Sequence, residues 1–208
     1  MLGRMAAKRL LDLACATLLL LALTPVLFVV VSALALDMLF VPRDRGGFLY
    51  REPRISRGRV FSLLKFRTLR TDALADLGTK GGHARLYEAE PGNLIWAGRR
   101  VLKPWYLDEL PQLVNVLRGD ISLVGPRPWP PEMVERQIAE GLTYRNEVRA
   151  GLTGPAQVTK GSGLRFADLD LSYVEKLRTL RGFALVRYDL RILWATVRVI
   201  VRGEGLSY

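Results

Sequence analysis

The sequence predicts a mostly helical α+β fold, with a membrane helix over residues 1–42 followed by a compact domain over residues 43–208. Three observations lead to this prediction. Residues 13–36 form an almost unbroken apolar run, long enough to enter a hydrocarbon core as a helix. Several later segments have helical periodicity and helix-ending glycines. The short apolar stretch at residues 60–66 is a candidate for a strand, and residues 121–124 form a further short apolar stretch.

Composition narrows the classes of function. The 208 residues carry a net charge of +11, so the chain requires an anionic partner: nucleic acid, lipid head groups or a phosphate-bearing substrate. The apolar N-terminus favours the last two, and no nucleic-acid-binding motif is present. The single cysteine, Cys15, and the single histidine, His83, exclude an internal disulfide, a cysteine metal site and a histidine triad. Any catalysis would depend on carboxylates and basic residues.

The apolar run contains Thr24 and Pro25 near its middle. Proline removes a backbone hydrogen bond, so a kink is expected there, and the Thr24 hydroxyl can bond to a freed carbonyl. Both flanks of the run are basic, whereas a single span should have its positive flank on one side only. A helix that breaks at Pro25 and returns to the same side satisfies both observations. A plain span and a cleaved signal peptide are the alternatives.

The elements after residue 42 are predicted from periodicity and from glycine and proline positions. Residues 60–66 read as a strand or a helix start, and residues 71–98 as loop with one short helix. The amphipathic segment 183–201 is expected to pack on the core, to lie in the membrane interface or to form a homodimer contact. The remaining helices are expected at residues 109–118, 131–147 and 169–180, and the remaining loops at residues 43–60 and 151–163.

Asp108 and Glu109 stand where the predicted helix 109–118 begins. The free N–H groups and positive dipole of a helix start keep a carboxylate ionised and also attract phosphate. An ionised aspartate beside a phosphate can act as a nucleophile. Acidic residues at a helix start are more commonly simple caps, so the pair alone does not establish catalysis.

Three basic residues are candidates for binding phosphate. Arg127 lies between two prolines, which restrict its backbone and suit a fixed, bidentate guanidinium. Lys65 and Arg67 alternate with Phe66, so on a strand they would share one face. The alternatives are an incidental surface arginine and a solvated edge strand.

Several segments resemble the bacterial sugar transferase family, the monotopic polyprenyl-phosphate phosphoglycosyl transferases. The resemblance extends over nearly the whole chain and is most specific at LDELPQLVNVLRGDISLVGPRP, residues 107–128. It also includes KFRTL at 65–69, GLTGPAQV at 151–158, DLSYV at 170–174 and DLRIL at 189–193. In the stretch before Asp108 the spacing differs by one residue, so Arg99, Arg100 and Lys103 are all candidates for the basic residue expected there.

The resemblance implies a two-step transfer of a sugar phosphate from a UDP-sugar to polyprenyl (undecaprenyl) phosphate, the first membrane step in assembling a glycoconjugate. Asp108 would be the nucleophile, and Glu109 would be its partner as a base or in holding Mg²⁺. It further implies a re-entrant helix broken at Thr24-Pro25 and a catalytic domain on the cytoplasmic face of the bacterial inner membrane. Substrate phosphates would meet Lys65, Arg67, Arg127, Arg145 and Gln157. A catalytically inactive, membrane-tethered module that binds lipid phosphate or a pathway partner is the competing hypothesis.

Overall fold

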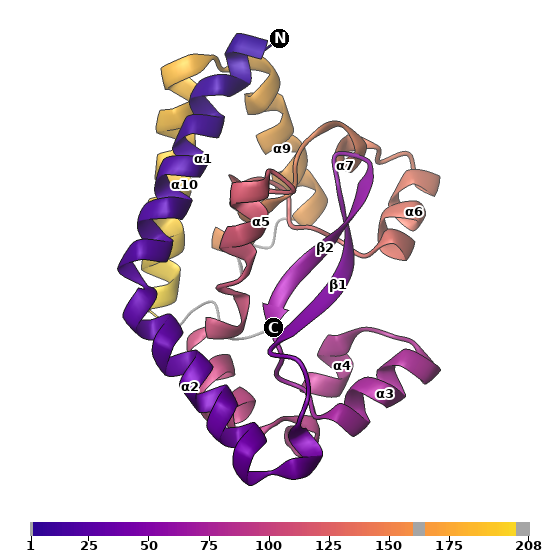
Figure 1. The fold of residues 1–208 in the computed structure, drawn as a ribbon. Coiled ribbons are helices and arrows are strands. Elements are labelled where there is room, and N and C mark those ends of the chain that lie inside the picture. The colour runs from indigo at the N-terminus through magenta and orange to yellow at the C-terminus, as the bar shows by residue number, and fades with distance from the viewer. Residues whose placement is uncertain (1, 160–164, 203–208) are drawn as a thin grey trace. The chain divides into compact units, whose positions relative to one another are not determined.

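The computed structural model describes residues 2–159 and 165–202 and confirms a mostly helical α+β fold with small sheets (Figure 1). The described strands are β1 (Leu49–Ser56), β2 (Arg59–Phe66), β3 (Ser122–Val124) and β4 (Gly151–Thr153). The α-helices are α1 (Leu2–Ala22), α2 (Thr24–Phe40), α3 (Thr71–Lys80), α4 (Ala84–Glu88), α5 (Gln112–Arg118), α6 (Pro131–Ala139), α7 (Tyr144–Glu147), α8 (Pro155–Val158), α9 (Phe166–Thr179) and α10 (Gly182–Val201). Short 3₁₀ or π turns are η1 (Pro42–Asp44), η2 (Pro91–Asn93), η3 (Gly98–Leu102), η4 (Lys103–Trp105) and η5 (Leu107–Glu109).

The chain divides into two compact units, each of which is discontinuous in sequence. Unit 1 comprises Met1–Leu18, Pro53–Leu63 and Leu113–Tyr208, and unit 2 comprises Leu19–Glu52 and Leu64–Gln112. The hairpin of β1 and β2 passes from one unit into the other. The boundary predicted at residue 42 separates a membrane helix from a compact domain. It concerns location in a membrane, and it stays a prediction.

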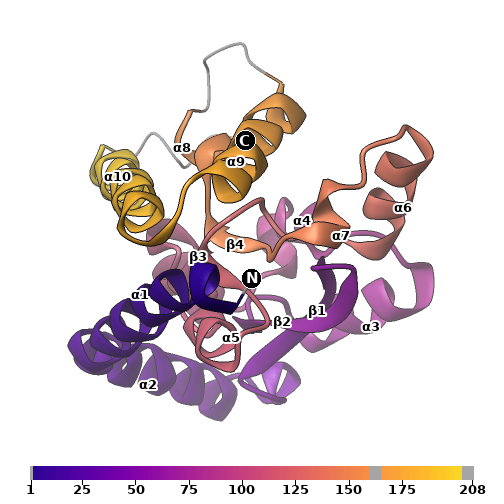
Figure 2. The same ribbon diagram turned by 90° about the horizontal axis from the view of Figure 1, so that it is seen from above.

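In unit 1, β3 and β4 pair in parallel, with Ser122 opposite Gly151 and Val124 opposite Thr153 (Figure 2). Helix α10 packs against both strands and against α8. The glycines of two sequence motifs meet here, because a Cβ on Gly151 would lie 2.1 Å from the nitrogen of Gly125. This contact explains why glycine stands at both positions: the backbones approach too closely for any side chain.

The described N-terminal part of α1 is fixed in unit 1 by buried polar contacts, alongside α10 (Figures 1 and 2). Lys8 Nζ lies 2.6 Å from Asp189 and 3.0 Å from the carbonyl of Val124. The Asp12 carboxylate accepts hydrogen bonds from the hydroxyl of Ser122 and, at 3.0 Å, from the backbone nitrogen of Leu123. Paired and hydrogen-bonded charges are the form in which charges are tolerated in an interior. The first turns of this helix are therefore a structural part of unit 1.

In unit 2, α2 packs its inner face on the segment that leads to Asp108. Val30 and Leu34 are fully buried in one cluster with Ile95 and Leu102. The buried carboxylate of Asp37 accepts a hydrogen bond from the backbone nitrogen of Ala97 at 2.9 Å. Apolar packing and this polar contact together attach the stretch before Asp108 to α2.

Helices α1 and α2 meet at Leu23, where their axes bend by 61°. Pro25 lies in the first turn of α2, and the Thr24 hydroxyl donates to the carbonyl of Leu20 at 3.0 Å. This is the expected hydrogen bond to a backbone carbonyl freed at the proline break. No single described helix is long and apolar enough to cross a bilayer, whereas Met5–Ala22 and Thr24–Phe40 reach that length and composition together.

Four expectations about secondary structure were wrong in extent. Residues 71–98 contain α3, α4 and η2 rather than a single short helix. The helix expected over 131–147 divides into α6 and α7, because Gly141 adopts a φ of 85° that ends the first of them. Residues 43–60 include β1, and residues 151–158 of the glycine-rich loop form β4 and α8. Residues 160–163 of that loop lie outside the described part of the chain. The helices expected at 169–180 and 183–201 are present as α9 and α10.

Candidate active site

Asp108 lies in a 3₁₀ turn, not at the start of an α-helix. The turn η5 covers Leu107–Glu109, and α5 begins at Gln112, so the predicted helix start was wrong by three residues. Tyr106, just before the turn, has a φ of 55°, a left-handed conformation that is rare for a residue with a side chain. Such strain persists where the surrounding structure determines the backbone, and it recurs at functional sites. The chain is thus bent sharply to present Asp108.

Lys103 is the basic residue that meets Asp108. Its Nζ lies 3.0 Å from Asp108 Oδ2 and 2.7 Å from Glu88 Oε2. Glu88 Oε1 in turn accepts a hydrogen bond from the Thr68 hydroxyl at 2.7 Å. These contacts form a chain from Thr68 through Glu88 and Lys103 to the carboxylate, and they decide among the three basic candidates in favour of Lys103.

Burial affects the pKa values of the two charged groups that meet in this contact, Asp108 and Lys103. The Asp108 residue is 2% exposed, and desolvation raises the pKa of its carboxyl; Lys103 lowers it and Glu109 raises it again. Burial by itself would lower the pKa of Lys103, but Asp108 and Glu88 outweigh it, so this pKa is raised. Lys103 is therefore held as a cation, while Asp108 is an ionisable carboxyl whose charge depends on that cation.

Lys65 is the second cation near this carboxylate. It lies near the end of β2, its charge lowers the pKa of Asp108, and its Nζ is 3.5 Å from Glu52. Glu109 is half-buried beside Asp108 in the same turn. The site thus combines two adjacent carboxylates with two ammonium groups.

The donor set is compatible with Mg²⁺ shared with a substrate. Within residues 2–159 and 165–202, no group of three or more acidic, histidine or cysteine side chains could hold a metal ion. Magnesium proteins commonly supply only one or two carboxylates and leave the other positions to water and phosphate oxygens. Asp108 and Glu109 fit that description, because the charge of Glu109 disfavours ionisation of Asp108 and a cation would relieve this repulsion.

Arg67 is engaged by the protein itself. It follows β2, is 3% exposed, and donates to the carbonyls of Gly47, Leu69 and Asp44. The alternation that would place it on the face of Lys65 therefore does not hold, because the strand ends at Phe66. Arg67 thus joins the segment before β1 to the segment after β2 through hydrogen bonds to their backbone carbonyls.

Arg145 is likewise buried, in unit 1. Its guanidinium contacts Gln137 and Asp170, both at 2.8 Å, and donates to the backbone carbonyl of Arg127. It also lies 4.3 Å from the ring centre of Trp129. Arg145 thereby fixes the backbone of the Pro-Arg-Pro segment, in which the side chain of Arg127 is half-buried.

Gln157, in α8, has both side-chain amide atoms buried with no hydrogen-bond partner among the described residues. Buried amides without partners are rare and call for an explanation such as a ligand. Three further residues have structural roles. The Tyr173 hydroxyl donates to the carbonyl of Val124 or to Asp189, at 2.9 Å from each. The hydroxyls of Thr153 and Thr196 lie 2.8 Å apart. Asp108, Glu109, Lys65 and Arg67 belong to unit 2, and Arg127, Arg145 and Gln157 to unit 1.

Sequence reasoning missed Glu88 and Thr68. Thr68 lies within the motif 65–69, which could have drawn attention to it. Glu88 lies in the region between residues 71 and 98 that was read mainly as loop, and no local pattern distinguishes it from its exposed neighbour Glu90.

Comparison with known proteins gives a consistent result. The sequence profile described as "Bacterial sugar transferase" matches residues 3–203. The chain is 35% identical, over 93% of its length, to the undecaprenyl-phosphate glucose phosphotransferase of Komagataeibacter xylinus, of which it spans 36%. It is 31% identical over 95% of its length to the undecaprenyl-phosphate galactose phosphotransferase of Salmonella typhimurium, of which it spans 41%. It is 32% identical over 98% of its length to the uncharacterized sugar transferase EpsL of Bacillus subtilis, of which it spans 91%. This chain belongs to the bacterial sugar transferase family.

Proposed function

We propose that this protein transfers a sugar 1-phosphate from a UDP-sugar to undecaprenyl phosphate. The observation that carries the proposal is the buried Asp108 carboxylate, 3.0 Å from Lys103 and adjacent to Glu109 in a strained turn. The names of several relatives describe transfer of a sugar phosphate to this lipid phosphate, and this supports the choice of acceptor.

In the first step, an oxygen of Asp108 attacks the β-phosphorus of the UDP-sugar. The bond between this phosphorus and the bridging oxygen breaks, UMP leaves with that oxygen, and the sugar phosphate is held as an acyl phosphate on Asp108. Lys103 favours the ionised, nucleophilic form of the carboxylate. Lys65 supplies positive charge near the phosphates.

In the second step, a phosphate oxygen of undecaprenyl phosphate attacks the same phosphorus. The bond to Asp108 breaks, the carboxylate is regenerated, and the product is a lipid diphosphate sugar. Glu109 accepts a proton from the acceptor where one is present. Asp108 and Glu109 would hold Mg²⁺, which neutralises negative charge on phosphate oxygens.

The remaining candidates have distinct parts in this proposal. Arg127 binds phosphate, and Gln157 offers its unpaired amide to substrate. Arg145 and Arg67 act as positioning residues, because the described contacts occupy their guanidinium groups with backbone carbonyls and neighbouring side chains. The bent pair of α1 and α2 forms a re-entrant membrane helix that places the site at the cytoplasmic face, where both substrates meet.

The test uses the full chain, purified in detergent, with undecaprenyl phosphate and a panel that includes UDP-glucose, UDP-galactose and UDP-N-acetylgalactosamine. We expect UMP release with at least one sugar and a fall of at least about 10⁴-fold in Asp108→Asn. Asp76→Asn, which neutralises an exposed aspartate of α3, is the matched control and should keep full activity. Without the acceptor, the wild-type chain should release about one UMP per protein and gain the mass of a sugar phosphate.

Two results would contradict the proposal. Full activity in Asp108→Asn would exclude the covalent mechanism. Absence of UMP release with every sugar, together with binding of undecaprenyl phosphate, would support the inactive binding module instead.

A further inference from the structure

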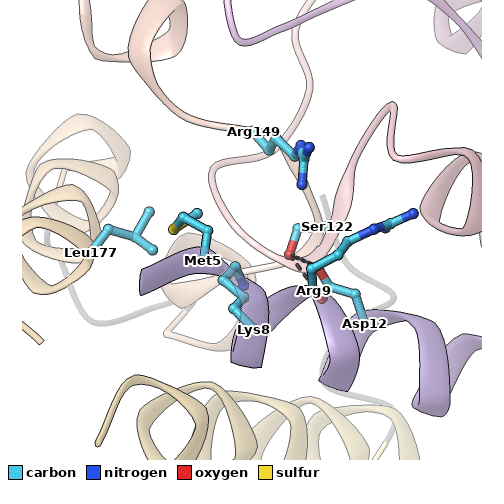
Figure 3. A pocket seen from close by; sticks show the side chains of 7 residues that line it. All are labelled: Met5, Lys8, Arg9, Asp12, Ser122, Arg149 and Leu177. Carbon is cyan, nitrogen blue, oxygen red and sulfur yellow. Dashed lines mark hydrogen bonds between the residues drawn. The ribbon is translucent and has the colours of Figure 1, made fainter. Parts of the chain in front are cut away.

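A small pocket in unit 1 has no part in the proposed reaction. It lies between α1, the first residue of β3, the segment just before β4, and α9. Its lining residues are Met5, Lys8, Arg9, Asp12, Ser122, Arg149 and Leu177 (Figure 3). Three of these residues are basic and one is acidic. Lys8 is paired with Asp189 at 2.6 Å, so Arg9, Arg149 and Asp12 determine the charge of the pocket.

Arg149 is the unusual member of this group. It is half-buried, and its guanidinium has no hydrogen-bond or ion-pair partner in the part of the chain that the structure describes. Burial and the charges of Arg9 and Arg57 lower its pKa, while Asp12 raises it. A guanidinium without a partner beside two like charges is unfavourable unless an anion joins them.

Both neighbouring arginines are held in place by the backbone. The guanidinium of Arg9 donates to the carbonyls of Val116 and Leu117, at 2.6 Å and 2.7 Å, at the end of α5. Arg57 occupies the turn between β1 and β2 with a φ of 52°, and its nitrogen donates to Val148, the residue before Arg149. An arginine in this left-handed conformation is disfavoured against glycine or asparagine, and the backbone contact with Val148 places Arg57 next to the segment that carries Arg149.

The single carboxylate in the pocket leaves the excess of positive charge in place. Asp12 is 1% exposed, and its oxygens accept from the hydroxyl of Ser122 and the backbone nitrogen of Leu123. One carboxylate thus lines the pocket together with the guanidinium groups of Arg9 and Arg149, and the positive charge of Arg57 also acts on Arg149. This imbalance matches the charge of one phosphate group.

We propose that Arg149, with Arg9 and Arg57, forms a phosphate-binding site separate from the residues around Asp108. Its ligand is a phosphate ester, supplied either by the head group of an anionic lipid or by a soluble phosphate. Exposed apolar residues of α1, among them Leu10 at 69% and Leu18 at 65% exposure, occupy the same helix as Arg9 and favour a ligand at a lipid surface. The proposal does not depend on catalysis, so its test needs no turnover.

The experiment measures thermal unfolding of the full chain in two settings. In detergent, inorganic phosphate is titrated against sodium chloride of equal ionic strength. In nanodiscs, phosphatidylcholine alone is compared with phosphatidylcholine containing phosphatidylglycerol. We expect the wild-type chain to be stabilised by phosphate, by phosphatidylglycerol or by both, and Arg149→Gln to bind about fivefold more weakly.

Two further variants separate binding from folding. Arg57→Asn removes a charge, yet asparagine suits the left-handed conformation, so this variant should fold and still lose binding. Arg136→Gln removes an exposed charge of α6 in the same unit and should behave as the wild-type chain.

Each outcome decides a point. Loss of the phosphatidylglycerol effect in both binding variants identifies a lipid head group. Loss of the phosphate effect alone identifies a soluble phosphate. The proposal is overturned if neither ligand stabilises the wild-type chain, or if Arg149→Gln and Arg57→Asn respond as Arg136→Gln does.

Discussion

The ammonium of Lys103 lies 3.0 Å from the carboxylate of Asp108, five positions later in the chain. Two short turns and the left-handed Tyr106 separate them, so the contact depends on the fold of this segment and not on helical spacing. Burial raises the pKa of Asp108 and Lys103 lowers it, so this contact is the main interaction that favours the ionised carboxylate, with a smaller contribution from Lys65.

Replacing Lys103 should change the pH dependence of the reaction. In Lys103→Met the pKa of Asp108 rises further, so the acid limb of kcat/KM for UMP release should move to higher pH. At neutral pH the rate should fall about 10- to 100-fold, as for loss of a hydrogen bond to a charged group. Lys103→Arg keeps the charge and should shift the limb much less. An unchanged limb in Lys103→Met would show that Lys103 does not control Asp108.

Glu88 should act through Lys103. Glu88→Gln keeps an acceptor for Thr68 but removes the charge that holds the ammonium, so we expect kcat to fall several-fold with little change in KM. In a double-mutant cycle with Lys103→Met, the two effects should be clearly non-additive. Glu90→Gln, in the same region but exposed, is the control. Additive effects would mean that Glu88 contributes independently of Lys103.

Asp108→Asn should be more stable than the wild-type chain, although we expect it to lose activity. A carboxyl whose pKa is higher in the folded than in the unfolded chain stabilises the fold while protonated, and this contribution is lost as the pH rises through the folded-state pKa. At neutral pH the ionised Asp108 therefore lowers stability, and its neutral replacement should raise the free energy of unfolding by about 0.5–2 kcal/mol. Chemical denaturation in detergent measures this difference. The gain should disappear at acid pH, where Asp108 is protonated in both states.

Gly98 should tolerate no side chain. A Cβ at this position would lie 2.7 Å from the carbonyl oxygen of Thr68, so Gly98→Ala should cost about 1–3 kcal/mol and displace the segment that carries Lys103. Gly78, in α3, has open space around it, and Gly78→Ala should stabilise the chain by about 0.5–1 kcal/mol. Thermal unfolding and UMP release of the two variants test the contrast. Equal stability of both would contradict the close approach.

The sequence predicted elements with strong local signals and missed what depends on contacts distant in the chain. The periodicity of residues 183–201 marks α10 clearly, and Pro126 and Pro128 restrict the backbone of residues 125–128. The helix start was predicted at Glu109, although Pro111 is a local signal for the observed start of α5 at Gln112, because proline favours the beginning of a helix. No local pattern shows that Asp108 and Glu109 form a separate turn held against Lys103.

The same limit applies to the site residues. Arg67 and Arg145 look like phosphate ligands in a basic sequence, but their nearest partners are carbonyls and side chains that only the folded chain brings together. The choice of Lys103 over Arg99 and Arg100 also required the fold, because Lys103 contacts Asp108 whereas Arg99 and Arg100 lie exposed in the π turn at Gly98–Leu102. Charge and motif therefore located the region, and tertiary contacts assigned the roles.

The hydrogen bond from Ala97 to Asp37 joins residues 60 positions apart, and this separation has a consequence for biosynthesis. The ribosome completes α2 well before it adds the stretch that carries Lys103 and Asp108. When that stretch emerges, Val30, Leu34 and Asp37 already offer a surface on which it can fold. Helices α1 and α2 are thus synthesised first, and the contact between Lys103 and Asp108 can form only after that step.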